Sequence, residues 1–190
     1  NVDEAFGRTE PDEEIQDLLR ASEGLNLALH YLSGSVTYDP LINKVDAELA
    51  SKIVWLDALI MNVDRTPRNT NMLMWHKELW LIDHGAAFYF HHSWQDLDNQ
   101  YKKPFPQIKD HVLLPFATKL MEVDAEMKEI FDLGKIKDIV QLVPDEWLQD
   151  EYSDLNESQR RNVYIRFLEE RIANSYLFVN EAENAREALI

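Results

Sequence analysis

Two polar stretches decide the fold: NVDRTPRNTN at residues 62–71 and LIDHG at residues 81–85. Residues 46–61, before the first stretch, are apolar on nearly every side of a helix, which is typical of a helix buried within a domain. Residues 72–75 and 79–82 are predicted to form two short strands joined by a tight turn. This order of segments predicts a mainly α fold with a small β-hairpin, in which a helical lobe carries a polar active-site loop.

The remaining segments are predicted mostly as helices and loops. Proline and three acids at residues 11–14 indicate a helix start, and the alternation at 25–32 predicts a short strand or an extended segment. Residues 86–106 are predicted to be a long loop. Further helices are expected over 107–131, around 135–142, from Pro144, and in a long final helix capped by Asn156 or Ser158, with an inward stripe of Ile165, Leu168, Ile172, Tyr176 and Val179.

The composition narrows the function classes. The 190 residues carry a formal net charge of −16, which repels phosphate backbones and anionic lipids, so neither nucleic acid nor a membrane is an expected direct partner. The chain has no cysteine, which excludes disulfides and thiolate metal sites and fits a cytoplasmic location. Between residues 62 and 72 the only charges are Asp64, Arg65 and Arg68, a small net-positive island.

The two polar stretches hold the groups that phosphoryl transfer from ATP requires. This reaction needs a carboxylate to orient the attacking hydroxyl and oxygen ligands to hold Mg²⁺ against the phosphates. Asp64 and Asn69 stand five residues apart, and Asp83 ends the hairpin, which returns the chain beside the loop. The spacing therefore predicts a catalytic carboxylate and a magnesium site built on a short hairpin.

The same residues resemble the HipA-like kinases. Residues 55–61 and 31–35 resemble that group too, and the polar stretches are also similar to the Asp-Arg-His-x-x-Asn and Asp-Phe-Gly elements of phosphoinositide kinases. The resemblance implies a single domain, residues 1–190, that forms the large lobe of a protein-kinase-like fold. Its parts would be a hinge-side helix and connecting segment at 1–45, the catalytic helix, loop and metal-binding hairpin at 46–90, and a helical remainder at 91–190.

The resemblance also implies roles for individual residues, with ATP and Mg²⁺ as cofactors. Asp64 would be the catalytic base, and Arg65 would lie beside it and screen phosphate charge. Asn69 and Asp83 would be the Mg²⁺ ligands. The substrate would be a hydroxyl, most simply a Ser or Thr of a protein.

Four more residues are expected to support the site: Asp57, Asn62, His84 and Gly85. We interpret Asp57, a carboxylate on an apolar helix, as a structural acceptor that holds the backbone amides of the loop. Gly85 would let the backbone turn sharply after the metal ligand. Two departures from the family patterns are Thr66, where histidine is common, and His84, where the metal triplet usually has an aromatic residue.

A zinc site is the alternative metal hypothesis. His84, His91 and His92 with Asp83 could supply zinc ligands, but their spacing matches no zinc motif. Lys102 and Lys103 are more simply explained as solvated loop residues.

A kinase also needs a glycine-rich cover over the phosphates and a lysine on a nearby strand. The five glycines are too dispersed to form such a cover. We therefore expect the small N-terminal lobe to lie upstream, to be a separate polypeptide, or to have been lost. Two alternatives to a protein kinase follow: a pseudokinase or binding subunit without catalysis, and a small-molecule phosphotransferase of the aminoglycoside or choline kinase type. The latter families usually carry histidine where Asn62 stands.

Overall fold

The computed structural model describes residues 1–3, 5, 11–92, 97–149 and 154–189, and its contacts divide the chain into two units, Asn1–Ser33 and Gly34–Ile190. In the first unit, α2 (Glu13–Ala21) begins after Asp12, whose carboxylate accepts the amides of Glu14 and Ile15. Residues 25–32 form no strand and follow an exposed course. The predicted helix start is confirmed, and the alternation at 25–32 gives extended chain only.

The second unit contains a small antiparallel sheet in the order β1-β2-β3. Its hairpin is β2 (Met72–Trp75) and β3 (Glu78–Leu81), as predicted, and the two turn residues His76 and Lys77 have φ of 49° and 69°. Positive φ at both turn positions matches the right-handed twist of the flanking strands. The additional strand β1 (Val36–Thr37), which the sequence analysis did not predict, pairs with β2.

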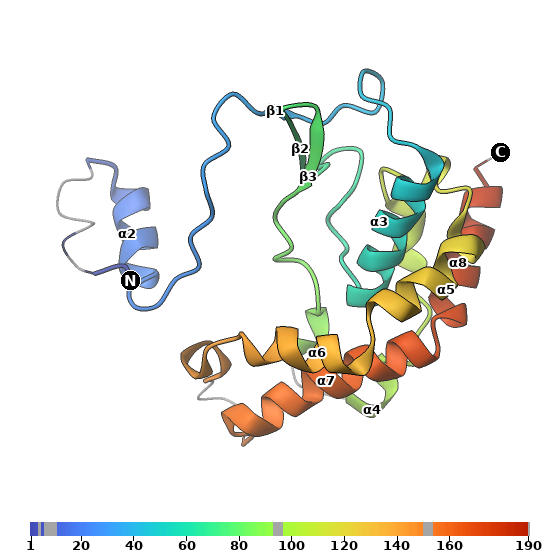
Figure 1. Ribbon diagram of the computed structural model, residues 1–190. Helices are drawn as coiled ribbons and strands as arrows, with labels where there is room; N and C mark the ends of the chain where they lie inside the picture. The colour runs from blue at the N-terminus through green and yellow to red at the C-terminus, as the bar shows by residue number, and fades with distance from the viewer. Residues whose placement is uncertain (4, 6–10, 93–96, 150–153, 190) are drawn as a thin grey trace. The chain divides into compact units, whose positions relative to one another are not determined.

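The central element is helix α3 (Ala47–Ile60), which lies against α5 (Leu120–Ile130) and α8 (Tyr176–Glu187) (Figure 1). Asp46 caps it by accepting the amides of Glu48 and Leu49, and Val54, Trp55, Ala58 and Leu59 are almost completely buried. The helix ends at Met61, whose φ of 55° lies in the left-handed region. This reversal sends the chain directly from the core into the polar loop.

The remaining elements are shorter than the sequence suggested. Residues 107–131 do not form one helix, because Pro106 and Pro115 lie in separate 3-10 turns before α5 begins. The long final helix is divided at Asn174 and Ser175, and Tyr176, expected on its inward stripe, is 56% exposed. In chain order these elements are η1 (Tyr89–His92), α4 (Leu97–Gln100), η2 (Pro106–Asp110), η3 (Leu114–Phe116), α5 (Leu120–Ile130), α6 (Leu133–Gln141), η4 (Asp145–Leu148), α7 (Glu157–Ala173) and α8 (Tyr176–Glu187).

One buried cluster joins α3, the 3-10 turns, α5 and α8 into the main core. Arg171 on α7 is buried beside it and donates to the carbonyl oxygens of Ala58, Leu59 and Lys103 at 2.6, 2.8 and 3.0 Å. A cation at the C-terminal end of a helix complements the helix dipole, so Arg171 fixes the end of α3. Burial lowers the pKa of Arg171 to about 10, which leaves it charged at neutral pH. The predicted fold class, mainly helical with a small sheet, is confirmed, and none of the described helices is long and apolar enough to cross a membrane.

Candidate active site

The loop from Asn62 to Asn71 is held by backbone hydrogen bonds at several points. The amide of Asn62 donates to Asp57 O, and Thr66 and Asn69 exchange amide–carbonyl bonds of 2.9 and 3.1 Å. The carbonyl of Arg65 accepts the amide of Val112 at 3.0 Å, which ties the loop to the segment between η2 and η3. The loop is therefore a fixed platform at the end of α3.

Asp64 lies at the centre of a small amide–carboxylate cluster. Its Oδ2 accepts hydrogen bonds from Asn69 Nδ2 at 2.7 Å and from Asn71 Nδ2 at 3.0 Å. The Nδ2 of Asn71 also lies 3.4 Å from the carbonyl oxygen of Asp83. The structure thus brings Asp64, Asn69 and Asp83 together. Asn71, to which the sequence analysis assigned no role, is the bridge between the loop and the end of the hairpin.

The chain reverses at Asp83, which has a φ of 49°. The sequence analysis assigned this reversal to Gly85, but Gly85 does not have a positive φ. Its amide instead donates to Asp83 Oδ1 at 3.3 Å, and a Cβ at Gly85 would approach the same oxygen to 3.3 Å. Glycine at 85 therefore keeps space beside the Asp83 carboxylate and leaves the turn to Asp83 itself.

Asp57 is the buried acceptor behind the loop. Its Oδ1 accepts from Asn62 Nδ2 at 3.0 Å, and its Oδ2 accepts from Arg65 Nε at 2.5 Å and faces His111 Nε2 at 2.9 Å. Burial by itself would raise the pKa of Asp57, but the hydrogen bonds from His111 and Arg65, together with the charge of Arg65, more than offset it and lower the pKa. Asp57 thus holds the loop through side chains and not, as expected, through loop amides.

His111 was missed by the sequence analysis. It lies 54 residues after Asp57, and a single histidine in a loop carries no signal of its own. Its Nδ1 accepts the amide of Leu113 at 3.0 Å, so its Nε2 carries the proton and donates to Asp57.

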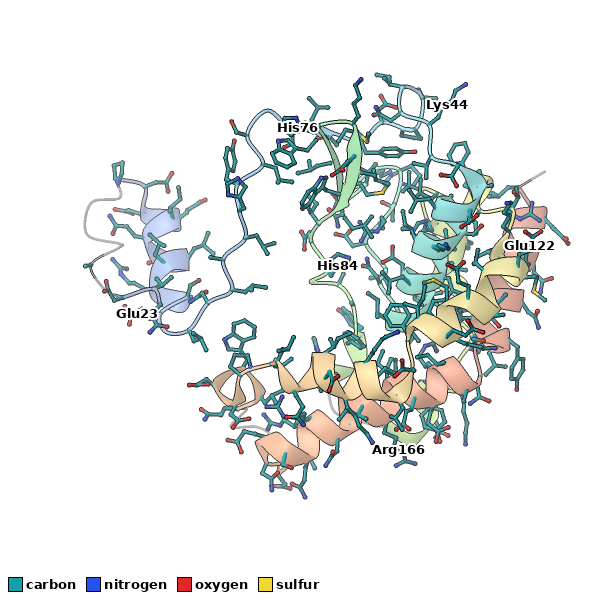
Figure 2. The ribbon with its side chains drawn as sticks, viewed as in Figure 1. Glu23, Lys44, His76, His84, Glu122 and Arg166 are labelled. Atoms are coloured by element: carbon teal, nitrogen blue, oxygen red, sulfur yellow. The ribbon has the colours of Figure 1, made fainter. Side chains whose placement is uncertain are left out.

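Arg65 is buried beneath the loop, with no exposed side-chain area. Besides Asp57, its guanidinium contacts the carbonyl oxygen of Asn71 and lies 3.0 Å from His84 Nε2. Because a guanidinium only donates, His84 Nε2 must accept, and burial together with the charge of Arg65 lowers the pKa of His84. Figure 2 shows His84 on the segment that leaves the hairpin. The expectation that Arg65 screens phosphate charge is therefore wrong. Its side chain is buried and links α3, the loop and the segment after the hairpin.

The chemistry of the cluster suits a hard cation. Asn69 uses Nδ2 to bond Asp64, which leaves its Oδ1, like the exposed Asp83 carboxylate, as an oxygen donor of the kind Mg²⁺ prefers. Within the described residues, no three His, Cys, Asp or Glu side chains are grouped so as to hold a metal. Of the proposed zinc ligands, His91 lies 3.1 Å from the hydroxyl of Tyr164, and the side chain of His92 lies outside the described residues.

A buried helix that ends in an Asp-x₄-Asn loop, followed by a hairpin that ends in aspartate, is the arrangement of the helical lobe of a kinase-type phosphotransferase. The family model described as HipA-like kinase matches residues 17–178. The chain therefore belongs to the HipA-like kinase family. No curated protein and no solved structure matches it.

Proposed function

We propose that this protein transfers the γ-phosphate of ATP, with Mg²⁺, to a hydroxyl group, most simply that of a Ser or Thr in a protein. The observation that carries the proposal is the cluster in which Asp64 accepts from Asn69 at 2.7 Å while Asn71 links it to Asp83. Membership of the HipA-like kinase family supports the reaction class.

In the proposed mechanism Asp64 is the catalytic base. Its carboxylate orients the acceptor hydroxyl and takes its proton as the hydroxyl oxygen bonds to the γ-phosphorus and the bond to the β-phosphate oxygen breaks. Asn69 Oδ1 and the Asp83 carboxylate would hold Mg²⁺, which neutralises developing charge on the phosphates when it is bound. The side-chain amides of Asn69 and Asn71 donate to the Asp64 carboxylate and keep it oriented.

The buried residues beneath the loop, Asp57 and Arg65, would hold the catalytic loop in position. Asp57 and Arg65 have no exposed side-chain area and join α3 to the loop, while the guanidinium also contacts the carbonyl of Asn71. A rigid support matters because small displacements of catalytic groups lower the rate sharply. We place Arg65 and Asp57 in this supporting role. The cover over the phosphates would come from an N-terminal lobe, in the same or a separate polypeptide.

The test is phosphate transfer from γ-labelled ATP by the complete protein and its Asp64→Asn and Asp83→Asn variants. Both variants should lose transfer while their thermal unfolding stays close to that of the unaltered protein. Asp83 is exposed, and an Asn at 64 keeps the one oxygen that accepts from Asn69 and Asn71. Asp46→Asn, which makes the same chemical change at the N-cap of α3, is the matched control and should transfer normally. Undiminished transfer in both site variants would show that the proposed residues are not the catalytic ones.

A binding subunit without catalysis is the competing function. It predicts no transfer by the unaltered protein under any metal condition, and no Mg-ATP binding in calorimetry when the N-terminal lobe is present. Saturable, Mg²⁺-dependent nucleotide binding would exclude it.

A further inference from the structure

A groove of about 760 Å³ opens beside the candidate active site. It is lined by the segment Val36–Asn43 and by the loop segment Pro67–Leu73 with Ile82. Because Asn69 and Asn71 line it, the groove leads directly to the cluster around Asp64. Figure 2 labels Lys44, the residue that follows the segment Val36–Asn43 and precedes α3.

Arg68 is the one cation among the described residues that line this groove. It is exposed, and no hydrogen bond or ion pair joins its guanidinium to another described residue. The groove also contains one carboxylate, that of Asp39, which accepts the amide of Leu41 at 2.8 Å. The chain has a net charge of −16 and repels anions as a whole, but the unpaired Arg68 can attract an anionic group to this groove.

The Val36–Asn43 segment presents two large apolar side chains to solvent. Leu41 is 92% exposed and Ile42 is 77% exposed. Both belong to a turn closed by four hydrogen bonds between residues 39 and 43, the shortest of them from Asn43 N to Asp39 O at 2.7 Å. Because Leu41 and Ile42 are exposed, they add no burial free energy to the fold. A bound partner could bury them at little entropic cost, since the turn is already ordered.

We propose that this groove binds the acceptor, and that the acceptor is a protein segment carrying a carboxylate side chain and an apolar side chain near the target hydroxyl. The carboxylate would meet Arg68, and the apolar side chain would pack on Leu41 and Ile42. This inference rests on the proposed function and deepens it by stating the substrate class. The continuity of the groove with Asn69 places such a segment with its hydroxyl toward Asp64.

Binding can be measured without catalysis. The probes are two fluorescent peptide libraries with a central Ser, one with Glu and Leu at the flanking positions and one with Lys replacing Glu. Fluorescence anisotropy with the complete protein, in the absence of ATP, should favour the Glu library. Arg68→Glu should weaken binding of the Glu library about tenfold and reverse the preference between the libraries. Leu41→Ser with Ile42→Ser should weaken binding of both libraries.

Lys137→Glu is the control, because it makes the same charge reversal at an exposed lysine of α6 outside the groove. It should leave both affinities unchanged. The proposal would be overturned if Arg68→Glu still preferred the Glu library to the Lys library. It would also be overturned if Arg68→Glu bound the peptides normally but had a raised KM for Mg-ATP, since Arg68 would then serve the nucleotide. If the unaltered protein binds the Glu library selectively but transfers no phosphate, the result counts against the proposed function and not against the groove as a peptide site.

Discussion

Replacing Asp57 by Asn removes a negative charge from a carboxylate with no exposed area that faces Arg65 and His111. The amide retains one oxygen, which can still accept from Asn62 in place of Oδ1. Its nitrogen then faces Arg65 Nε and His111 Nε2, both of which are donors in the folded protein. Two buried donors lose their acceptor, and the charge of Arg65 is left uncompensated.

Removing one partner of a buried ion pair costs about 3–5 kcal/mol, against a stability of about 5–15 kcal/mol for a typical domain. We therefore expect Asp57→Asn to remain folded at room temperature but to unfold at much lower urea concentration. The assay is urea unfolding followed by circular dichroism. Asp46→Asn is the control at the start of the same helix, and it should leave the urea midpoint nearly unchanged because Asp and Asn cap helices about equally.

The pH dependence of this loss follows from the lowered pKa of Asp57. Since its folded-state pKa lies below the ordinary value of 3.8, the unfolded chain binds the proton more readily, and the stabilisation is present above that value and disappears as pH falls through the folded-state pKa. The difference between the unaltered protein and Asp57→Asn should therefore be largest near neutral pH and shrink below about pH 4. A loss at neutral pH of less than about 1 kcal/mol would refute the buried ion-pair account.

Two further predictions concern residues that the sequence did not single out. Asn71→Gly keeps the backbone φ of 46° accessible but removes both bridging hydrogen bonds, so phosphate transfer should fall about tenfold or more; a normal rate would show that the bridge is dispensable. Arg171→Lys keeps the charge, but a lysine cannot reach the carbonyls of Ala58, Leu59 and Lys103 together. It should therefore lower the free energy of unfolding by about 2–4 kcal/mol in urea titrations, and an unchanged midpoint would contradict its role at the end of α3.

The parts of the fold set by local pattern could be predicted from the sequence. Helix α3 and the β2–β3 hairpin follow from apolar periodicity and strand length. The prediction of one helix over 107–131 was wrong because the apolar periodicity continues across Pro115, where the chain forms a 3-10 turn. Periodicity also passed through Asn174 and Ser175, whose side chains compete with helical backbone bonds.

The site divides in the same way. Asp64, Asn69 and Asp83 are recognisable because their spacing lies within one loop and one hairpin. His111 and Arg171 reach α3 and the loop from distant segments, and a lone buried histidine or arginine has no local signature. The burial of Arg65 could not be inferred either, because an arginine beside an aspartate in a polar loop looks equally suited to solvent, phosphate or a buried partner.

Calorimetric binding of Mg-ATP tests most directly the central claim that Asp83 with Asn69 holds the metal while Asp64 serves as the base. We expect the complete protein and Asp64→Asn to bind Mg-ATP with similar affinity, because Asn at 64 can still accept from both neighbouring amides. Asp83→Asn should lose most of the Mg²⁺-dependent affinity. Equal affinity in Asp83→Asn and the unaltered protein, or loss of binding in Asp64→Asn alone, would contradict the assignment.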